Sequence, residues 1–160
     1  MKETTQQREY STDCTLYLAL ELSQKKWKLG FTASLGQKAW KRRVEAGDLM
    51  ELDQAIELAR KRFGLPAGCR VLSCYEAGRD GFWLDRYLKS QGVESLVVDS
   101  ASIEVNRRAK RAKTDGLDAG SLTRMLVRYD SGEKKVWSVV HVPSVEAEDR
   151  RHLHRELACL

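Results

Sequence analysis

Four carboxylate side chains stand at positions from which they could act together. Glu21 ends a short apolar run, TLYLALE, and Glu76 ends a second one, CRVLSCYE. Asp115 and Asp118 are three residues apart at the start of a predicted helix, a spacing that places both on one helical face. Carboxylate oxygens are protein ligands that Mg²⁺ prefers, usually together with substrate phosphates. Glu21, Glu76, Asp115 and Asp118 are therefore candidate catalytic residues and ligands of Mg²⁺ or Mn²⁺.

A carboxylate cluster of this kind suits phosphodiester chemistry. Two divalent cations about 4 Å apart can hold the attacking and leaving oxygens of a displacement at phosphorus. Clustered carboxylates repel one another until a cation binds, so such a cluster is costly unless it is used. A chain with 23 acidic residues also places some at strand ends by chance, and Asp115 alone could serve as a favourable charge near a helix N-terminus. A metal site and a chance arrangement both remain open at this point.

The net charge of +5 is concentrated in two segments. Residues 24–45 contain seven Lys and Arg against one acidic residue, and residues 104–128 contain seven against three. Focused basic segments are typical of nucleic-acid binding, because each cation near a phosphate releases a counterion, whereas a solvated charged surface is the alternative. The candidate nucleic-acid-binding residues are Lys25, Lys26, Arg107, Arg108, Lys110, Arg111 and Lys113.

The pattern of apolar residues predicts an α/β fold. Antiparallel strands begin the chain, and helices then alternate with strands, which is typical of right-handed parallel crossovers. The expected architecture is a mixed sheet with an antiparallel three-strand start and helices on both faces. Glu21 and Glu76 would lie where the carboxyl ends of neighbouring strands meet, the usual place for ligands in such sheets. The predicted strands are 15–21, 26–31, 39–44, 69–76 and 94–98; the predicted helices begin near 49, 80, 115 and 145, and residues 136–142 are predicted to be extended.

Composition limits the class of protein. With 160 residues, 42% hydrophobic and 32% charged, the chain suits one globular domain rather than a disordered segment. No apolar run approaches the roughly 20 residues that cross a bilayer, and the polar N-terminus does not resemble a secretory signal, which favours a cytoplasmic location. The four cysteines lack zinc-site spacing, and Cys69 and Cys74 are predicted to be core thiols.

Three blocks of the chain, between about residues 15 and 130, resemble the DEDD-type insertion-sequence transposases, the family associated with bridge-RNA-guided recombination. The blocks are LYLALELSQKKWKLGF, CYEAGRDGFWLDRYL and RRAKRAKTDGLDAGSLTRML. In that family an acidic residue ends the first strand, a Glu precedes a Gly-aromatic helix start, and a basic run leads into a Lys-x-Asp-x-x-Asp-Ala block. The matching residues are Glu76, Gly78, Phe82 and Trp83 in the middle block, and Lys113, Thr114, Asp115, Asp118 and Ala119 in the last.

The resemblance implies an RNase H-like (RuvC-like) fold over residues 15–142, after a flexible N-terminus at 1–14. It implies that Glu21, Glu76, Asp115 and Asp118 bind a divalent metal and that the protein acts in DNA transposition and recombination, with DNA, a guide RNA and further copies of itself as partners. Residues 143–160 would begin a helical linker or coiled coil to a second domain that carries a nucleophilic serine. No residue here can be assigned as that serine, so we expect a fragment that is inactive in recombination alone.

One departure from the family pattern concerns Glu21, which stands where the family has Asp. The extra methylene moves the carboxylate, and we expect the site to adjust to it. Two other interpretations remain: a non-catalytic DNA- or RNA-binding module with a vestigial acidic site, and an oligomerisation unit that associates through the terminal helix. Trp27, Trp40 and Trp83 could stack on bases, although apolar Trp is more often part of a core.

Overall fold

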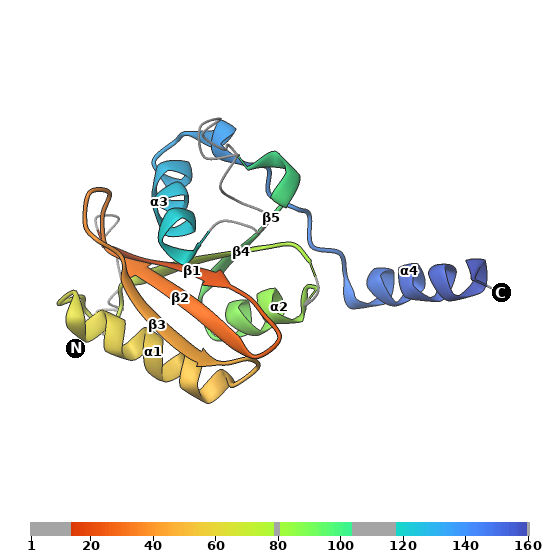
Figure 1. Ribbon diagram of the computed structural model, residues 1–160, viewed down its shortest axis with the longest axis horizontal. Coiled ribbons are helices and arrows are strands. Elements are labelled where there is room, and N and C mark those ends of the chain that lie inside the picture. Colours follow the sequence, from red (N-terminus) through yellow and green to blue (C-terminus); the bar gives the residue numbers. More distant parts are fainter. Residues whose placement is uncertain (1–13, 79–80, 104–117, 160) are drawn as a thin grey trace, which may run out of the picture.

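The computed structural model describes residues 14–78, 81–103 and 118–159. Its centre is a five-stranded sheet in the order β3-β2-β1-β4-β5 (Figure 1). Only β2 runs antiparallel to the other strands, because β1 pairs antiparallel with β2, β2 with β3, and both β1–β4 and β4–β5 are parallel. This is the strand arrangement of an RNase H-like fold, so the predicted fold class is confirmed. The strands are β1 (Thr15–Glu21), β2 (Lys26–Thr32), β3 (Trp40–Glu45), β4 (Arg70–Glu76) and β5 (Glu94–Val98).

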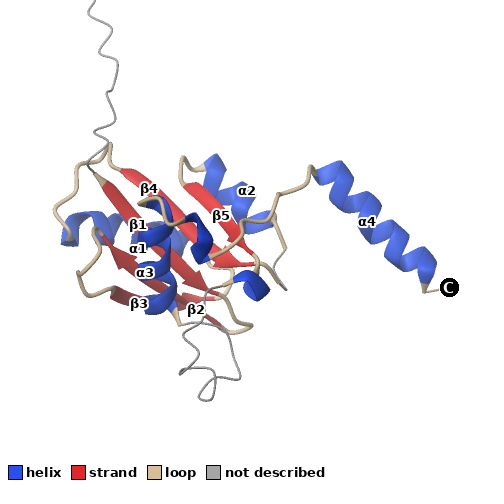
Figure 2. Ribbon diagram, turned by 90° about the horizontal axis from the view of Figure 1, so that it is seen from above, coloured by secondary structure: helices blue, strands red, loops and turns tan. Residues whose placement is uncertain are grey.

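Helices cover both faces of the sheet. α1 and α2 pack on one face and α3 packs on the other, while α4 extends away from the body (Figures 1 and 2). In the described part of the chain, no helix is long and apolar enough to cross a membrane. The helices are α1 (Leu49–Arg62), α2 (Trp83–Ser90), α3 (Ala119–Asp130) and α4 (Val145–Ala158), with short 3₁₀ turns η1 (Ser100–Ser102) and η2 (Lys134–Val136).

The sheet separates two apolar cores because successive side chains of a strand point to opposite faces. On β1, Leu18 and Leu20 belong to the larger core beneath α1 and α2, whereas Ala19 belongs to the smaller core beneath α3. On β4, Tyr75 and Cys74 divide in the same way. The last residue of each of these strands therefore lies on the α3 face.

The start of α3 differs from the prediction. The helix begins at Ala119, and Asp118 is its N-cap, with an extended backbone (φ −67°, ψ 162°). The expectation that Asp115 and Asp118 share a helical face is therefore wrong for Asp118, because an N-cap precedes the helical positions. Asp115 lies outside the described residues.

The other predicted elements are confirmed within a few residues, with two differences. α2 begins at Trp83 rather than near residue 80. In the stretch predicted to be extended, η2 reaches Val136, and Val139 forms only an isolated bridge with Val98. The first turn of α4 is tied to the body by Arg86, whose guanidinium contacts Glu148 at 2.6 Å.

The cysteine prediction is right for Cys74 and wrong for Cys69. Cys74 is buried with a free thiol, and its burial raises the pKa of that thiol. Cys69 forms a disulfide with Cys14, with 5.4 Å between their Cα atoms. The parallel register pairs Thr15 with Arg70, so the residues just before them are brought side by side. Their separation of 55 residues hides this pairing from the sequence.

Candidate metal and nucleic-acid site

Glu21 and Glu76 lie at the carboxyl ends of neighbouring parallel strands. The register pairs Leu20 with Tyr75, so the glutamates that follow them occupy adjacent positions at one edge of the sheet. Leu20 and Tyr75 face the larger core, and strand alternation therefore directs both glutamates toward α3. The strand-end argument made from the sequence is in this respect confirmed.

Asp118 reaches the same edge because α3 packs very closely on β2. A Cβ on Gly30 would stand 2.5 Å from Thr123 Oγ1 and 2.8 Å from the carbonyl oxygen of Ala119, so no larger residue fits without movement. Asp118 caps the helix, and its Oδ1 accepts a hydrogen bond of 2.7 Å from the backbone N–H of Ser121. The cap holds the carboxylate at the N-terminal end of α3, where the positive end of the helix dipole favours a negative charge.

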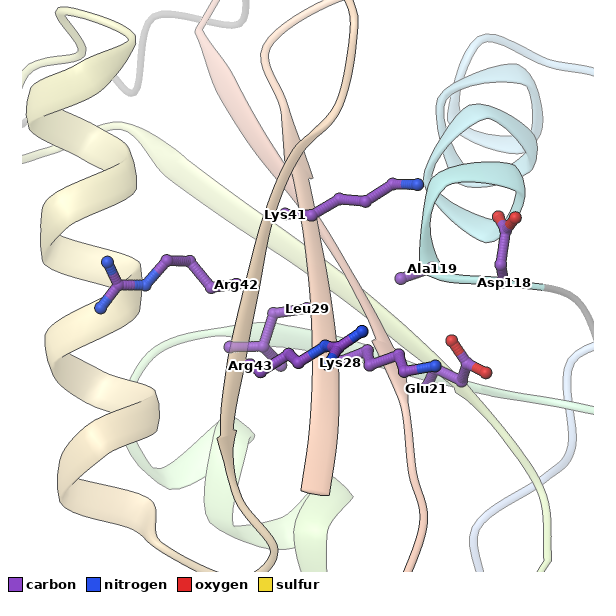
Figure 3. Close-up of a pocket in the computed structure, with 8 residues that line it drawn as sticks. All are labelled: Glu21, Lys28, Leu29, Lys41, Arg42, Arg43, Asp118 and Ala119. Atoms are coloured by element: carbon purple, nitrogen blue, oxygen red, sulfur yellow. The ribbon is translucent and has the colours of Figure 1, made fainter.

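Glu21 and Asp118 line one pocket with a volume of about 280 Å³ (Figure 3). One carboxylate oxygen of Glu21, Oε2, is buried and has no hydrogen-bond partner among the described residues. A buried acceptor without a partner costs about 1–3 kcal/mol, and more when it is charged. A cation beside this oxygen would satisfy it, and carboxylate oxygens are ligands that Mg²⁺ prefers. The two carboxylates share the pocket with four cationic side chains. The remaining lining residues are Lys28, Leu29, Lys41, Arg42, Arg43 and Ala119.

The described residues form only part of the expected carboxylate set. Glu76 lies at the same sheet edge but is not among the residues that line this pocket. Within ranges 14–78, 81–103 and 118–159, no three His, Cys, Asp or Glu side chains lie close enough together to hold a metal. Asp115 falls outside these ranges, so metal binding by the four residues stays a prediction.

The predicted nucleic-acid-binding residues fall mostly outside the described part. Lys25 is exposed in the turn after β1, and Lys26 forms an exposed ion pair with Glu45. Lys28, Lys41 and Arg43 line the pocket of Glu21 and Asp118; they contributed to the charge of residues 24–45 but were not predicted as site residues. The period-two alternation of β2, with Lys28 between the buried Trp27 and Leu29, was the signal that could have found the first of them. Arg107, Arg108, Lys110, Arg111 and Lys113 lie outside the described residues.

The three tryptophans considered for base stacking, of four in the chain, differ in what they can contact. Trp27 is only 1% exposed and belongs to the larger core, which rules out base stacking by this side chain in the folded state. Trp40 is half-buried, and the guanidinium carbons of Arg42 and Arg62 lie 5.5 and 5.3 Å from the centroid of its ring. Trp83 is 41% exposed and packs on Trp27.

Two curated relatives are similar to this chain. "Putative transposase y4rJ" of Sinorhizobium fredii (strain NBRC 101917 / NGR234) is 40% identical over 148 residues, which is 91% of this chain and 37% of the relative. "Putative transposase y4qE" of the same strain is 36% identical over 112 residues, or 70% of this chain and 25% of the relative. No protein-family model matches the chain, and no solved structure matches it significantly. The chain thus spans little more than a third of the first relative, and the two likenesses support a relationship to transposases.

Proposed function

We propose that this chain is the metal-dependent catalytic N-terminal part of a DNA transposase, which cleaves or exchanges DNA strands. The observation that carries the proposal is the buried Oε2 of Glu21, which has no hydrogen-bond partner in the part of the chain that the structure describes. It lies in a pocket shared with Asp118, at the carboxyl edge of an RNase H-like sheet. Likeness to two proteins named as transposases supports the same reading.

The proposed ligands are Glu21, Glu76, Asp115 and Asp118, which would hold Mg²⁺ or Mn²⁺. When bound, the metal would polarise a phosphodiester and stabilise the charge that develops on its oxygens. The chain's own contribution is to fix the ligands. Strand pairing places Glu21 beside Glu76, and the N-cap hydrogen bond to Ser121 holds Asp118. Glu21 is long enough to aim an oxygen into the pocket, so Glu in place of the family's Asp is compatible with metal binding.

The proposed partners are DNA, a guide RNA and further copies of the chain. Lys25, Lys26 and the basic residues at 107–113 would contact the phosphate backbone, since cations close to phosphates release counterions. α4 would begin the linker toward a second domain, because it has no buried residue and extends from the body (Figure 1). We expect the chain alone to bind metal and DNA without completing recombination.

Calorimetric titration of Mg²⁺ and Mn²⁺ tests the site, with the wild type compared with Glu21→Gln and with the double variant Asp115→Ala/Asp118→Ala. We expect binding in the wild type and its loss, or a weakening of at least about tenfold, in both variants. Glu57→Gln, an exposed carboxylate on the opposite face, is the control and should bind as the wild type does. Equal metal affinity in all four proteins would overturn the proposed site. The titration is repeated with a DNA duplex present, because substrate phosphates can complete the ligand set.

A further inference from the structure

Three cations share one face of the β2–β3 hairpin. The antiparallel register pairs Lys28 with Arg43 and Gly30 with Lys41. Their neighbours on these strands, Trp27, Leu29 and Val44, face the larger core, so the three cations stand on the opposite, α3 side of the sheet. All three are exposed, and none forms an ion pair with another described residue. Lys26 lies two residues before Lys28 on the same face and is instead paired with Glu45.

Lys41 reaches across β2 to the first turn of α3. The strand position between them is Gly30, which has no side chain to block the path. A Cβ on Gly120 would stand 3.1 Å from Lys41 Cε, 3.4 Å from its Nζ and 3.4 Å from Asp118 Oδ1, so the ammonium group lies close to the N-terminus of the helix (Figure 3). A cation at this end opposes the helix dipole. The arrangement is favourable when an anion lies between the two positive groups.

Arg42 shows that the grouping is specific to one face. It lies between Lys41 and Arg43 in sequence, yet its side chain points toward α1 (Figure 3), and its guanidinium stacks over Trp40 at 5.5 Å. The α3 side of the hairpin thus carries Lys41 and Arg43, whereas the other side carries Arg42. Two residues of a strand span roughly 6.8 Å, a length over which a DNA strand, with one phosphate per about 3.4 Å of helix axis, offers two phosphates.

We propose that Lys28, Lys41 and Arg43 form a phosphate-binding wall that holds the backbone of a DNA strand beside the Glu21–Asp118 pocket. The inference rests on the proposed function, because it takes DNA as the substrate of that site. The inference adds to the proposed function the side chains that would position the DNA strand. The wall borders the carboxylates directly, since Glu21 pairs with Lys28 across β1 and β2, and all three cations line the same pocket as Glu21 and Asp118.

Fluorescence anisotropy with a labelled 20-base-pair duplex tests the wall, in EDTA so that DNA binding is measured without the metal. The critical comparison is Arg43→Ala against Arg62→Ala, which remove the same charge on opposite faces of the sheet. Arg62 ends α1, lies over Trp40 at 5.3 Å and does not line the pocket. We expect Arg43→Ala and Lys41→Ala each to weaken binding severalfold and to reduce the slope of log K against log salt by about 0.9. Arg62→Ala should leave both quantities unchanged. Far-UV circular dichroism of each variant checks that the exposed substitution leaves the fold intact.

The outcomes separate this proposal from the proposed function. Equal weakening by Arg62→Ala and Arg43→Ala would reduce the effect to overall charge and overturn the wall. Wild-type binding that neither Lys41→Ala nor Arg43→Ala weakens would also overturn it, while metal titration of the carboxylates would still stand as evidence for the function. Residue-dependent binding of a single-stranded RNA of the same length, with no binding of the DNA, would overturn the assignment of DNA. A wild type that binds no nucleic acid would overturn the wall as well.

Discussion

Gly30 of β2 and Thr123 of α3 approach so closely that a Cβ on the glycine would stand 2.5 Å from the threonine Oγ1. The hydroxyl of Thr123 is buried and donates a hydrogen bond of 2.6 Å to the carbonyl oxygen of Ala119, one turn earlier. This hydrogen bond lies within α3, and it is the close packing on Gly30 that sets the first turn of the helix against β2, beside the Asp118 cap. The position of the Asp118 carboxylate depends on this contact.

Gly30→Ala is expected to lower the free energy of unfolding by about 1–3 kcal/mol, the usual cost of forcing an extra methyl group into a packed site. The backbone carbonyl of Ala119, 2.8 Å from the added Cβ, cannot move without moving the first turn of α3. Urea denaturation followed by circular dichroism measures the change. Gly68→Ala is the matched control, because a Cβ there meets no atom within 4 Å. Equal stability of the two variants would contradict the close packing.

Asp118 is observed as a helix cap and proposed as a metal ligand, and different substitutions separate the two roles. Asn caps helices as well as Asp does, so Asp118→Asn should change the free energy of unfolding by less than about 0.5 kcal/mol. It removes a carboxylate, however, and should weaken Mg²⁺ binding at least about tenfold. Thermal unfolding and calorimetric titration of the same samples measure the two effects.

Asp48 provides the control for this prediction, since its side chain caps α1 by accepting from the N–H of Glu51 at 3.0 Å. Asp48→Asn should leave both stability and Mg²⁺ affinity unchanged. Asp48→Ala and Asp118→Ala should each cost about 1 kcal/mol of stability. Wild-type Mg²⁺ affinity in Asp118→Asn would show that the carboxylate serves only as a cap.

Asp130 should make the fold sensitive to acid. Burial by itself would raise the pKa of the Asp130 carboxyl, but hydrogen bonds from Arg70 and Tyr17 and the charge of Arg70 hold this pKa below its usual value. A lowered folded-state pKa gives stability that is present above the unfolded pKa near 4 and is lost as pH falls through the folded value. Asp130→Asn should lower the free energy of unfolding at pH 7 by about 1–2 kcal/mol, a modest amount because the pair with Arg70 is partly exposed. It should also make stability fall less as the pH drops below 4. Urea midpoints at pH 3, 4 and 7 measure both effects. Asp149→Asn, which changes an exposed residue of α4, should leave the midpoints unchanged. If the urea midpoint of Asp130→Asn falls from pH 4 to pH 3 as much as that of the wild type, other groups cause the acid sensitivity.

The same contact predicts alkaline sensitivity. Burial and the hydrogen bond to Asp130 raise the pKa of Tyr17 to about 12 from 10.0. A raised folded-state pKa gives stability that is complete below pH 10 and is lost as pH rises toward 12. In Tyr17→Phe, the urea midpoints measured at pH 9, 10 and 11 should fall less with rising pH than those of the wild type. If the phenol titrates at its ordinary value in the folded wild type, observed by its absorbance, this coupling is absent.

The Cys14–Cys69 disulfide should stabilise the fold by about 2–4 kcal/mol under oxidising conditions, because it closes a loop between residues far apart in the chain. We expect the reductant dithiothreitol to lower the melting temperature of the wild type to that of Cys14→Ser/Cys69→Ser, which should itself be insensitive to it. Cys159→Ser is the control, since Cys159 is exposed and free. Thiol titration of the unfolded, unreduced wild type should detect Cys74 and Cys159 alone.

The period of apolar residues reports local structure, and it was enough to predict the order of the elements and the location of Glu21 and Glu76 at strand ends. The face of the sheet on which Lys28 lies could also be predicted, since successive side chains of a strand point to opposite faces. Contacts between segments distant in sequence came from the tertiary structure. Parallel pairing brought Cys14 to Cys69, and the close approach at Gly30 brought Asp118 and Lys41 together. Such contacts join segments dozens of residues apart, and they depend on which strands pair and how near a helix can pack, quantities that local periodicity does not encode.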